Sequence, residues 1–448
     1  MSKAADVLVL GGGPAGIISA VTAKRCYPDK KIMLMKDLAN GAIPCGIPYM
    51  FASLKNPDEN KLGNAALEKN NIELVIDKAI SIDRAAKEVT GESQEKYSYE
   101  KLILAVGSSP IKPPITGIDK EGVYPIYKDM DYLKKAVEKI KKAKNVLIVG
   151  GGFIGVEFAD EISKLDGVNV YLVEMFKNLL MNSFDLEFSE LAEEKLKSHG
   201  VNVFTNTQVK EIKGEKKVEK VCFADGKEIE VDSVILGVGA VSNVQLAVQS
   251  GIDLGRGKGI WVDEYMRTSD PDIFAVGDCA GKRDFYTRKH TPVMLASTAT
   301  AEARIAGANL YQLKVVRENK GTIAIYSTYI DNLALGSVGL TEQTAKNEGF
   351  EIVSGLAQGM DKHPGTLPGA SKVKVKLIFS RKSGIILGGQ VAGGVSCGEM
   401  INVIGMAVQQ RVSYTDLETL QMATHPCLTS APTMYPIVLA AEDAAEKV

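Results

Sequence analysis

The sequence predicts an α/β protein with two Rossmann-like dinucleotide-binding domains and a C-terminal α+β domain. Two short apolar runs, residues 7–10 and 146–149, are each followed at once by a glycine fingerprint. The chain from about residue 321 alternates β-rich stretches with helical ones and has no fingerprint. At 448 residues the protein is also too long for one ordinary core, so two or three domains are expected.

Each fingerprint predicts a strand, a tight turn and a helix. Glycines at this spacing permit the turn, let backbone N–H groups approach a pyrophosphate, and place that diphosphate at the positive end of a helix. One match alone is weak evidence, but two with flanking strands indicate two bound dinucleotides with electrons passing between them. The residues concerned are Gly11, Gly13, Pro14, Ala15 and Gly16 in the first copy and Gly150, Gly152 and Gly155 in the second.

The order of the elements predicts that the second domain is inserted into the first. Pro110, Pro113 and Pro114 mark a crossing between domains. An apolar strand at residues 273–276 and a helix over about residues 292–310 then return to the first domain. We expect residues 1–114 and 246–320 to form the first domain, 115–245 the second, and 321–448 a C-terminal domain that pairs subunits.

Composition and charge limit the classes of binding partner that are expected. Lys and Arg number 53 against 55 Asp and Glu, so no broad field attracts nucleic acid or anionic lipid, and neither is expected as a partner. No apolar run approaches the roughly 20 residues that span a bilayer, and no cleavable signal is evident, which favours a cytoplasmic protein. The six cysteines form no CxxC pair, which disfavours a disulfide framework and a metal site.

An acidic residue follows the second fingerprint where a ribose contact is expected. The strand at residues 168–173 ends in Glu174, nineteen residues past the last glycine. An acid there hydrogen-bonds the ribose 2′-OH and repels a 2′-phosphate, so we expect NADH as the ligand, with a plain surface carboxylate as the alternative. The same count after the first fingerprint reaches Met35, whose thioether cannot replace a carboxylate, and Lys36 or Asp37 are candidates to compensate.

A single cysteine is the candidate redox group. Cys45 lies in residues 40–49, a loop expected to run into a helix whose N-terminus favours the reactive thiolate. Free cysteines are more often inert core residues. The nearest other cysteine in sequence is Cys26, at the end of the first predicted helix. A redox-active Cys45 would therefore be oxidised to a mixed disulfide, a persulfide or a sulfenic acid, which a flavin reduced by NADH could reduce again.

With these motifs the chain resembles the FAD-dependent pyridine nucleotide-disulfide oxidoreductases, in the single-cysteine branch of coenzyme A-disulfide reductase, NADH oxidase, NADH peroxidase and NADH-dependent persulfide or polysulfide reductases. The resemblance implies FAD in the first domain, NADH in the second, and a homodimer. It also implies that Cys45 lies against the isoalloxazine and that Asp278 bonds the ribityl chain. We expect Cys279 to be a packing residue, because a side chain beside that aspartate need not face the ring. Besides the fingerprints, the resemblance rests on residues 45–49, the run 154–157 ending in Glu157, the run 237–239 ending in Gly239, Asn243, and residues 262–269 and 272–280.

Departures from the family pattern point towards sulfur chemistry. Oxidase and peroxidase members place a histidine in the first glycine turn, where this chain has Pro14. The C-terminal tyrosine and proline cluster of coenzyme A-disulfide reductases is missing. His425-Pro426 is instead similar to the motif by which two-cysteine reductases deliver a histidine across the dimer interface, although the usual glutamate is absent. We hypothesise that His425 of the partner subunit acts as acid or base near Cys45, with a structural turn as the alternative.

These observations lead to an expected function and its rivals. We expect an NADH:disulfide oxidoreductase that uses Cys45 to reduce coenzyme A disulfide, a persulfide or a polysulfide. Cys427 is a candidate second thiol or else a buried residue, and Lys24 and Arg25 are candidate contacts for coenzyme A phosphates or else a solvated helix end. The rivals are an NADH oxidase that reduces oxygen at the flavin, and a flavin-bearing electron-entry subunit or NADH sensor that docks a protein partner.

Overall fold

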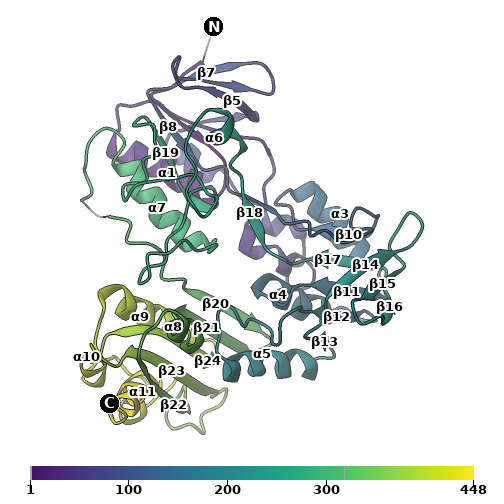
Figure 1. Ribbon diagram of the computed structural model, residues 1–448, viewed down its shortest axis with the longest axis vertical. Coiled ribbons are helices and arrows are strands. Elements are labelled where there is room, and N and C mark those ends of the chain that lie inside the picture. Colours follow the sequence, from purple (N-terminus) through teal and green to yellow (C-terminus); the bar gives the residue numbers. More distant parts are fainter. Residues whose placement is uncertain (1–2, 317) are drawn as a thin grey trace.

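Three five-stranded sheets form the centres of three regions of the molecule (Figure 1). The computed structural model describes residues 3–316 and 318–448. Two of the sheets are parallel and carry the glycine turns, and the third is antiparallel and C-terminal. This confirms the predicted fold class.

The first parallel sheet has the strand order β19-β8-β2-β3-β4. The central strand β2 (Val7–Leu10) is buried throughout and carries the first glycine turn at its carboxyl end. Helix α1 (Pro14–Cys26) packs on β2 and β3, and α7 (Ala296–Ala308) packs on α1. The other strands are β3 (Ile32–Lys36), β4 (Glu73–Ile76), β8 (Lys101–Leu104) and β19 (Ile273–Ala275).

The second parallel sheet has the order β10-β17-β11-β12-β13. Its central strand β11 (Asn145–Val149) carries the second glycine turn and leads into α4 (Phe153–Ser163). Apolar residues of the helices pack on this sheet. Val156 and Phe158 of α4 and Phe188 of α5 are fully buried there. The remaining elements are β10 (Val123–Pro125), β12 (Asn169–Val173), β13 (Asn202–Phe204), β17 (Ser233–Leu236), α3 (Met130–Ile140) and α5 (Leu186–Ser198).

The C-terminal sheet is antiparallel, with the order β20-β21-β24-β23-β22. Helices α9 (Cys397–Gln410) and α11 (Pro436–Ala445) pack on it. Strand β24 is buried at every position because α9 and α5 both contact it. The strands are β20 (Tyr326–Ile330), β21 (Leu333–Gly339), β22 (Ile352–Met360), β23 (Lys372–Ser380) and β24 (Ile386–Gly393).

Smaller elements flank these regions. A four-stranded sheet is formed by β1 (Lys3–Ala4), β7 (Lys96–Ser98), β6 (Glu88–Gly91) and β5 (Ala79–Asp83). A three-stranded sheet is formed by β14 (Val209–Lys213), β15 (Lys220–Phe223) and β16 (Glu228–Glu230), and a two-stranded one by β9 (Ser108–Pro110) and β18 (Ala240–Ser242). The short helices are α2 (Ala65–Lys69), α6 (Gln245–Gln249), α8 (Glu342–Asn347) and α10 (Tyr414–Glu418). Within the described residues, no helix has the length and apolar character needed to cross a bilayer.

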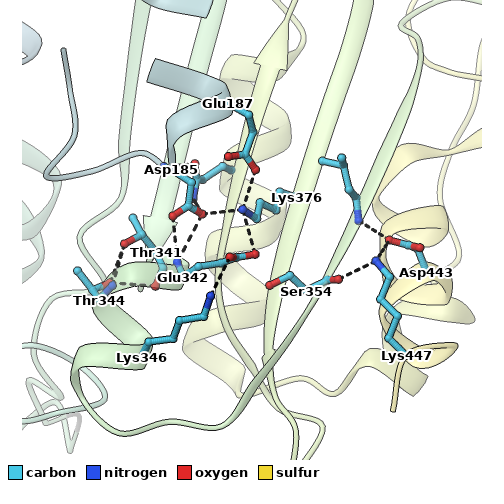
Figure 2. Close-up of polar contacts among 12 residues, drawn as sticks. Asp185, Glu187, Thr341, Glu342, Thr344, Lys346, Ser354, Lys376, Asp443 and Lys447 are labelled. Carbon is cyan, nitrogen blue, oxygen red and sulfur yellow. Dashed lines mark hydrogen bonds and ion pairs between the residues drawn. The ribbon is translucent and has the colours of Figure 1, made fainter. Parts of the chain in front are cut away.

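A buried lysine joins the second region to the C-terminal sheet. Lys376 of β23 lies 3.0 Å from Asp185 and 2.7 Å from Glu187, which begin α5, and 3.0 Å from Glu342 of α8 (Figure 2). Gln390 of β24 accepts from the backbone N–H of Asp185 and donates to its carboxylate. Burial would lower the pKa of Lys376, but the three carboxylates outweigh burial and raise it. This cluster fixes α5 on the C-terminal sheet.

Candidate functional site

One cavity of about 2450 Å³ joins all three regions. Both glycine turns line it, as do Cys45 and residues of β20 that include Thr328. The sequence analysis placed its candidates in separate motifs, and the fold brings most of them to this one space. The predicted residues that line the cavity are Gly11, Gly13, Pro14, Ala15, Lys36, Cys45, Gly150, Gly152, Glu157, Glu174, Gly239 and Asp278.

The glycine turns have the shape that a diphosphate requires. A Cβ atom on Gly16 would lie 1.9 Å from the carbonyl oxygen of Gly11, and one on Gly155 would lie 1.8 Å from that of Gly150, so only glycine permits this close packing. These third glycines lie beneath the turns and do not line the cavity. Above the turns the space is open.

The helix N-termini behind those turns are free to bind an anion. Gly13 and Gly152 are the N-caps of α1 and α4, neither helix has a side-chain cap or an acidic residue in its first turn, and a Cβ atom at either glycine would meet nothing within 4 Å. Unpaired N–H groups at a positive helix end suit a phosphate. Both turns therefore fit a dinucleotide diphosphate.

Each turn has the same backbone hydrogen bond, from its first glycine to the neighbouring strand, and this bond shows which residues of the two turns are equivalent. The N–H of Gly11 donates to the carbonyl of Met35 at 2.8 Å, and the N–H of Gly150 donates to that of Val173 at 2.8 Å. Met35 is therefore equivalent to Val173, and the residue after it, Lys36, is equivalent to Glu174. The count that reached Met35 was wrong by one, because the segment from the third glycine of the turn to this strand position is one residue longer in the first region, where α1 is longer than α4.

Glu174 belongs to the second glycine turn and is not a plain surface carboxylate. Its Oε2 accepts from the N–H of Gly151 at 2.6 Å and its Oε1 from that of Phe176 at 2.8 Å. Only 8% of the residue is exposed, and it lines the cavity. The carboxylate is thus fixed where the ribose contact was predicted. That NADH contact stays a prediction.

Asp278 is held beside the first turn by a hydroxyl and a cation. Ser108 donates its hydroxyl to Oδ2 at 2.7 Å, and the Nζ of Lys128 lies 3.7 Å from the same oxygen. The preceding turn is fixed because Glu302 accepts from the N–H of Gly277. The neighbouring Cys279 is fully buried, which confirms that it is a packing residue.

Cys45 lies on a tight turn, and the helix expected to follow its loop is replaced by short 3-10 turns. Two 3-10 turns, η1 (Pro44–Gly46) and η2 (Pro48–Met50), follow each other, and no α-helix starts there. The side chain is exposed to the cavity. The expected stabilisation of the thiolate is also wrong for this state, because partial burial by the cavity walls and the charge of Glu157 raise the pKa of Cys45, with Lys128 opposing them weakly.

Glu157 is an acidic group beside this cysteine. It lies on α4 and accepts a hydrogen bond from the hydroxyl of Thr328 at 2.9 Å. Burial, together with the like charges of Asp160 and Glu161, raises the pKa of Glu157 to about 7, although the Thr328 bond acts against the shift. Burial and Glu157 also raise the pKa of Tyr49, which lines the same cavity. The cavity thus contains a carboxyl group that can hold or lose a proton near neutral pH.

His425 and Cys427 lie outside this cavity in their own subunit. Both are exposed, and His425 accepts from the N–H of Cys427 at 3.2 Å within a turn closed by Thr429. The exposure of Cys427 contradicts the alternative that it is buried. Whether His425 reaches Cys45 of the partner subunit stays a prediction.

Lys24 and Arg25 end α1 and do not line the cavity. The Nζ of Lys24 donates to the carbonyls of Pro28 and Lys30 at 2.7 and 3.0 Å. These contacts favour the helix-end interpretation over a phosphate site. In the described part of the chain, no group of three or more His, Cys, Asp or Glu residues could hold a metal ion.

The sequence could have predicted some, but not all, of the other residues that line the cavity near Cys45. Tyr49 lies in the run that begins at Cys45, so its place could have been inferred. Thr328 and Lys128 reach the site from distant segments and belong to none of the motifs considered. Only the fold brings them to the cavity.

Comparisons with known proteins agree with this geometry. The family described as pyridine nucleotide-disulphide oxidoreductase matches residues 5–303, and the dimerisation domain of that family matches residues 325–435. An NADH oxidase of Methanocaldococcus jannaschii is 30% identical over 452 residues, covering 98% of this chain and 99% of the relative. A NAD(P)H coenzyme A polysulfide/persulfide reductase of Pyrococcus horikoshii is 32% identical over 395 residues, covering 86% and 87%. The structure of a NAD-dependent persulfide reductase from A. fulgidus has a TM-score of 0.91 at 29% identity, covering 99% of this chain and 83% of that one.

Proposed function

This chain belongs to the pyridine nucleotide-disulphide oxidoreductases, and from that premise we propose that it reduces a sulfur-sulfur bond through Cys45. It is an NAD(H)-dependent flavin oxidoreductase with FAD and NADH as cofactors. The observation that carries the sulfur proposal is that Cys45, Glu157 and both glycine turns line one cavity. The substrate class is a small disulfide, persulfide or polysulfide, coenzyme A disulfide included.

We assign FAD to the first glycine turn and NADH to the second. Asp278 and the N-terminus of α1 would hold the flavin, and Glu174 with the N-terminus of α4 would hold the nicotinamide nucleotide. Bound FAD supplies storage for the two electrons of NADH between two half-reactions. The proposed division is residues 1–114 and 246–320, 115–245, and 321–448, with the last forming a homodimer.

The protein's own chemistry then centres on one sulfur. The Cys45 thiolate attacks one sulfur of a substrate RSSR′, a Cys45–SR bond forms, and R′S⁻ leaves. Two electrons from NADH cleave that bond and free RS⁻, so the Cys45 thiolate is restored. In total NADH, one proton and RSSR′ become NAD⁺, RSH and R′SH, which balances atoms and electrons.

Glu157 supports this step as a proton store. Its pKa of about 7 means that it is partly protonated at neutral pH. In the protonated form it no longer raises the pKa of Cys45, and it can give its proton to a leaving thiolate. His425 of the partner subunit is the second proposed acid or base.

A second candidate function is oxygen reduction, which the relative named NADH oxidase favours. Pro14 argues against peroxide chemistry, since it has no group that titrates. Rates with oxygen and with coenzyme A disulfide or polysulfide, measured side by side in wild type and Cys45→Ser, decide between them. Sulfur reduction predicts a faster sulfur rate that is lost in Cys45→Ser. A faster oxygen rate that survives the substitution would instead establish the oxidase.

A further inference from the structure

A second cavity, of about 580 Å³, shares no lining residue with the one that contains Cys45. Five of the nine described residues that line it are basic, counting histidine, and none is acidic. This cationic cavity concentrates positive charge in a chain whose formal net charge is only -2. Its basic and aromatic residues are Arg256, Trp261, Arg283, Arg288, Lys289 and His290.

Two loops build the cationic cavity. The first, residues 253–261, is closed by backbone hydrogen bonds of 2.8 and 2.9 Å, and the second, residues 283–290, by one of 2.8 Å. The loops meet where His290 packs on Gly257, because a Cβ atom on that glycine would lie 3.3 Å from the Nδ1 of His290. The backbone thus holds the cations of both loops around one cavity.

Most of this positive charge is not neutralised by nearby carboxylates. Among the described residues, Lys289 is the one lining cation with an ion pair, to Glu348 at 2.6 Å. Asp284, the acid of the second loop, instead accepts from two backbone N–H groups of its own turn at 3.0 and 2.7 Å. Arg256 and Arg283 are exposed and have no carboxylate partner in that same part of the chain. Cations that share one cavity repel each other, and a bound anion would relieve this repulsion.

The side chains also indicate which kind of anion fits. The planar fork of a guanidinium group matches two oxygens of a phosphate. Trp261 is the single tryptophan of the chain, it is 37% exposed, and it lines the same cavity. An exposed indole is a surface on which an aromatic base can stack. A ligand with both phosphates and a base would use both features, whereas an inorganic anion would use only the cations.

We propose that the cationic cavity binds a nucleoside polyphosphate, with its phosphates held by Arg256 and Arg283 and its base on Trp261. A small ligand is favoured over a nucleic acid or an acidic protein, because the positive charge is confined to one cavity. The chain as a whole has 53 Lys and Arg against 55 Asp and Glu, so it has no broad field for a large polyanion. The site is separate from the glycine turns, and the inference is independent of which acceptor the enzyme reduces.

The test is a titration of the purified holoenzyme with ATP, followed by tryptophan fluorescence. Because the chain has a single tryptophan, the signal reports on this cavity, and ATP should change it until the site is saturated. Arg283→Met should weaken ATP binding about tenfold, the size of one charge-assisted hydrogen bond, and Arg256→Met should act in the same direction. Lys258→Met is the matched control, because this exposed lysine of the first loop does not line the cavity, and it should leave the affinity unchanged.

Calorimetry with the parts of the ligand tests the contact with the base. Inorganic tripolyphosphate and adenosine should each bind about tenfold more weakly than ATP, since each makes only some of the contacts. Trp261→Leu should bind ATP no more tightly than tripolyphosphate. The flavin content of each variant shows whether it has folded.

Three results would overturn the proposal. One is a fluorescence signal that ATP does not change, or an ATP affinity that is equal in wild type and in a variant with both Arg256→Met and Arg283→Met. That equality would place ATP at the glycine turns. Another is tripolyphosphate that binds as tightly as ATP, which indicates an anion site without a base contact. The third is a short acidic peptide or single-stranded DNA that displaces ATP at a lower concentration than tripolyphosphate does, which assigns the cavity to a macromolecule.

Discussion

Two sites with partly buried carboxyl groups lie at the same junction between the second region and the C-terminal sheet, and their pKa values shift in opposite directions. Burial alone would raise the pKa of Glu342, but its polar and charged neighbours, among them Lys376 at 3.0 Å, outweigh burial and lower it (Figure 2). Beside Cys45, Glu157 accepts a hydrogen bond only from the hydroxyl of Thr328 among the described residues, and burial raises the pKa of Glu157 to about 7. The first site is a fixed ion cluster that stabilises the junction. The second is free to exchange a proton in the cavity, and this difference separates a structural from a functional carboxyl.

The largest effect is expected at the sulfur itself. Cys45→Ser should lower turnover of a sulfur substrate by about 10³-fold or more, because a serine hydroxyl cannot form the sulfur-sulfur bond. The free energy of unfolding should be nearly unchanged, since the side chain is exposed to the cavity. Steady-state kinetics and urea unfolding of the same preparation measure both. A large loss of stability would instead place Cys45 with the structural residues.

The next largest effect is expected in the free energy of unfolding, when the ion cluster around Lys376 is broken. Lys376→Met leaves Asp185, Glu187 and Glu342 without their shared cation, and removing one partner of a buried ion cluster costs about 3–5 kcal/mol. Lys346→Met is the matched control, because this exposed lysine touches the same Glu342 at 3.4 Å and should cost less than about 1 kcal/mol. Urea unfolding at pH 7 compares them. Equal losses would contradict a special role for the buried lysine.

Glu157 should give the protein a stability that falls as pH rises. The carboxyl ionises near pH 4.5 in the unfolded chain and near pH 7 in the folded one. The folded state therefore binds more protons between these values, and stability declines across that window and levels off above it. The expected loss is on the order of 3 kcal/mol. Glu157→Gln should remove this decline, measured by urea unfolding at pH 5 and pH 8. An unchanged slope in the variant would show that Glu157 is not the group responsible.

The smallest effect is expected at Thr328. Its hydrogen bond lowers the pKa of Glu157, so Thr328→Val should raise that pKa further. The limb of the pH-rate profile that depends on Glu157 should move to higher pH, with little change in the maximal rate. A pH-rate profile of both proteins tests this. Movement to lower pH would contradict the assigned direction.

Much of this arrangement could be predicted from the sequence, because short-range patterns set it. Apolar runs followed by glycines specify strand, turn and helix, so β2, α1, β11 and α4 were placed correctly. The spacing also predicted an acid beside the second turn, where Glu174 accepts from the N–H of Gly151, although its contact with NADH stays a prediction. The same count failed at Met35, since the longer helix α1 shifts by one residue every later position in the strand.

The rest depends on contacts between distant segments. Thr328 and Lys128 come from other elements, and the sequence contains no local signal that either would lie near Cys45. The raised pKa values of Cys45 and Glu157 follow from burial in a cavity that three regions build together. The helix expected after Cys45 is replaced by two 3-10 turns, in which Pro44 and Pro48 each begin a new turn.

The most direct test of Cys45 as the redox group is an anaerobic titration with NADH. The protein is first treated with coenzyme A disulfide, which should leave a mixed disulfide at Cys45, and excess reagent is removed. Wild type should then consume about two equivalents of NADH per subunit, one for the flavin and one for the sulfur bond, whereas Cys45→Ser should consume about one. Uptake of a single equivalent by wild type would contradict the account.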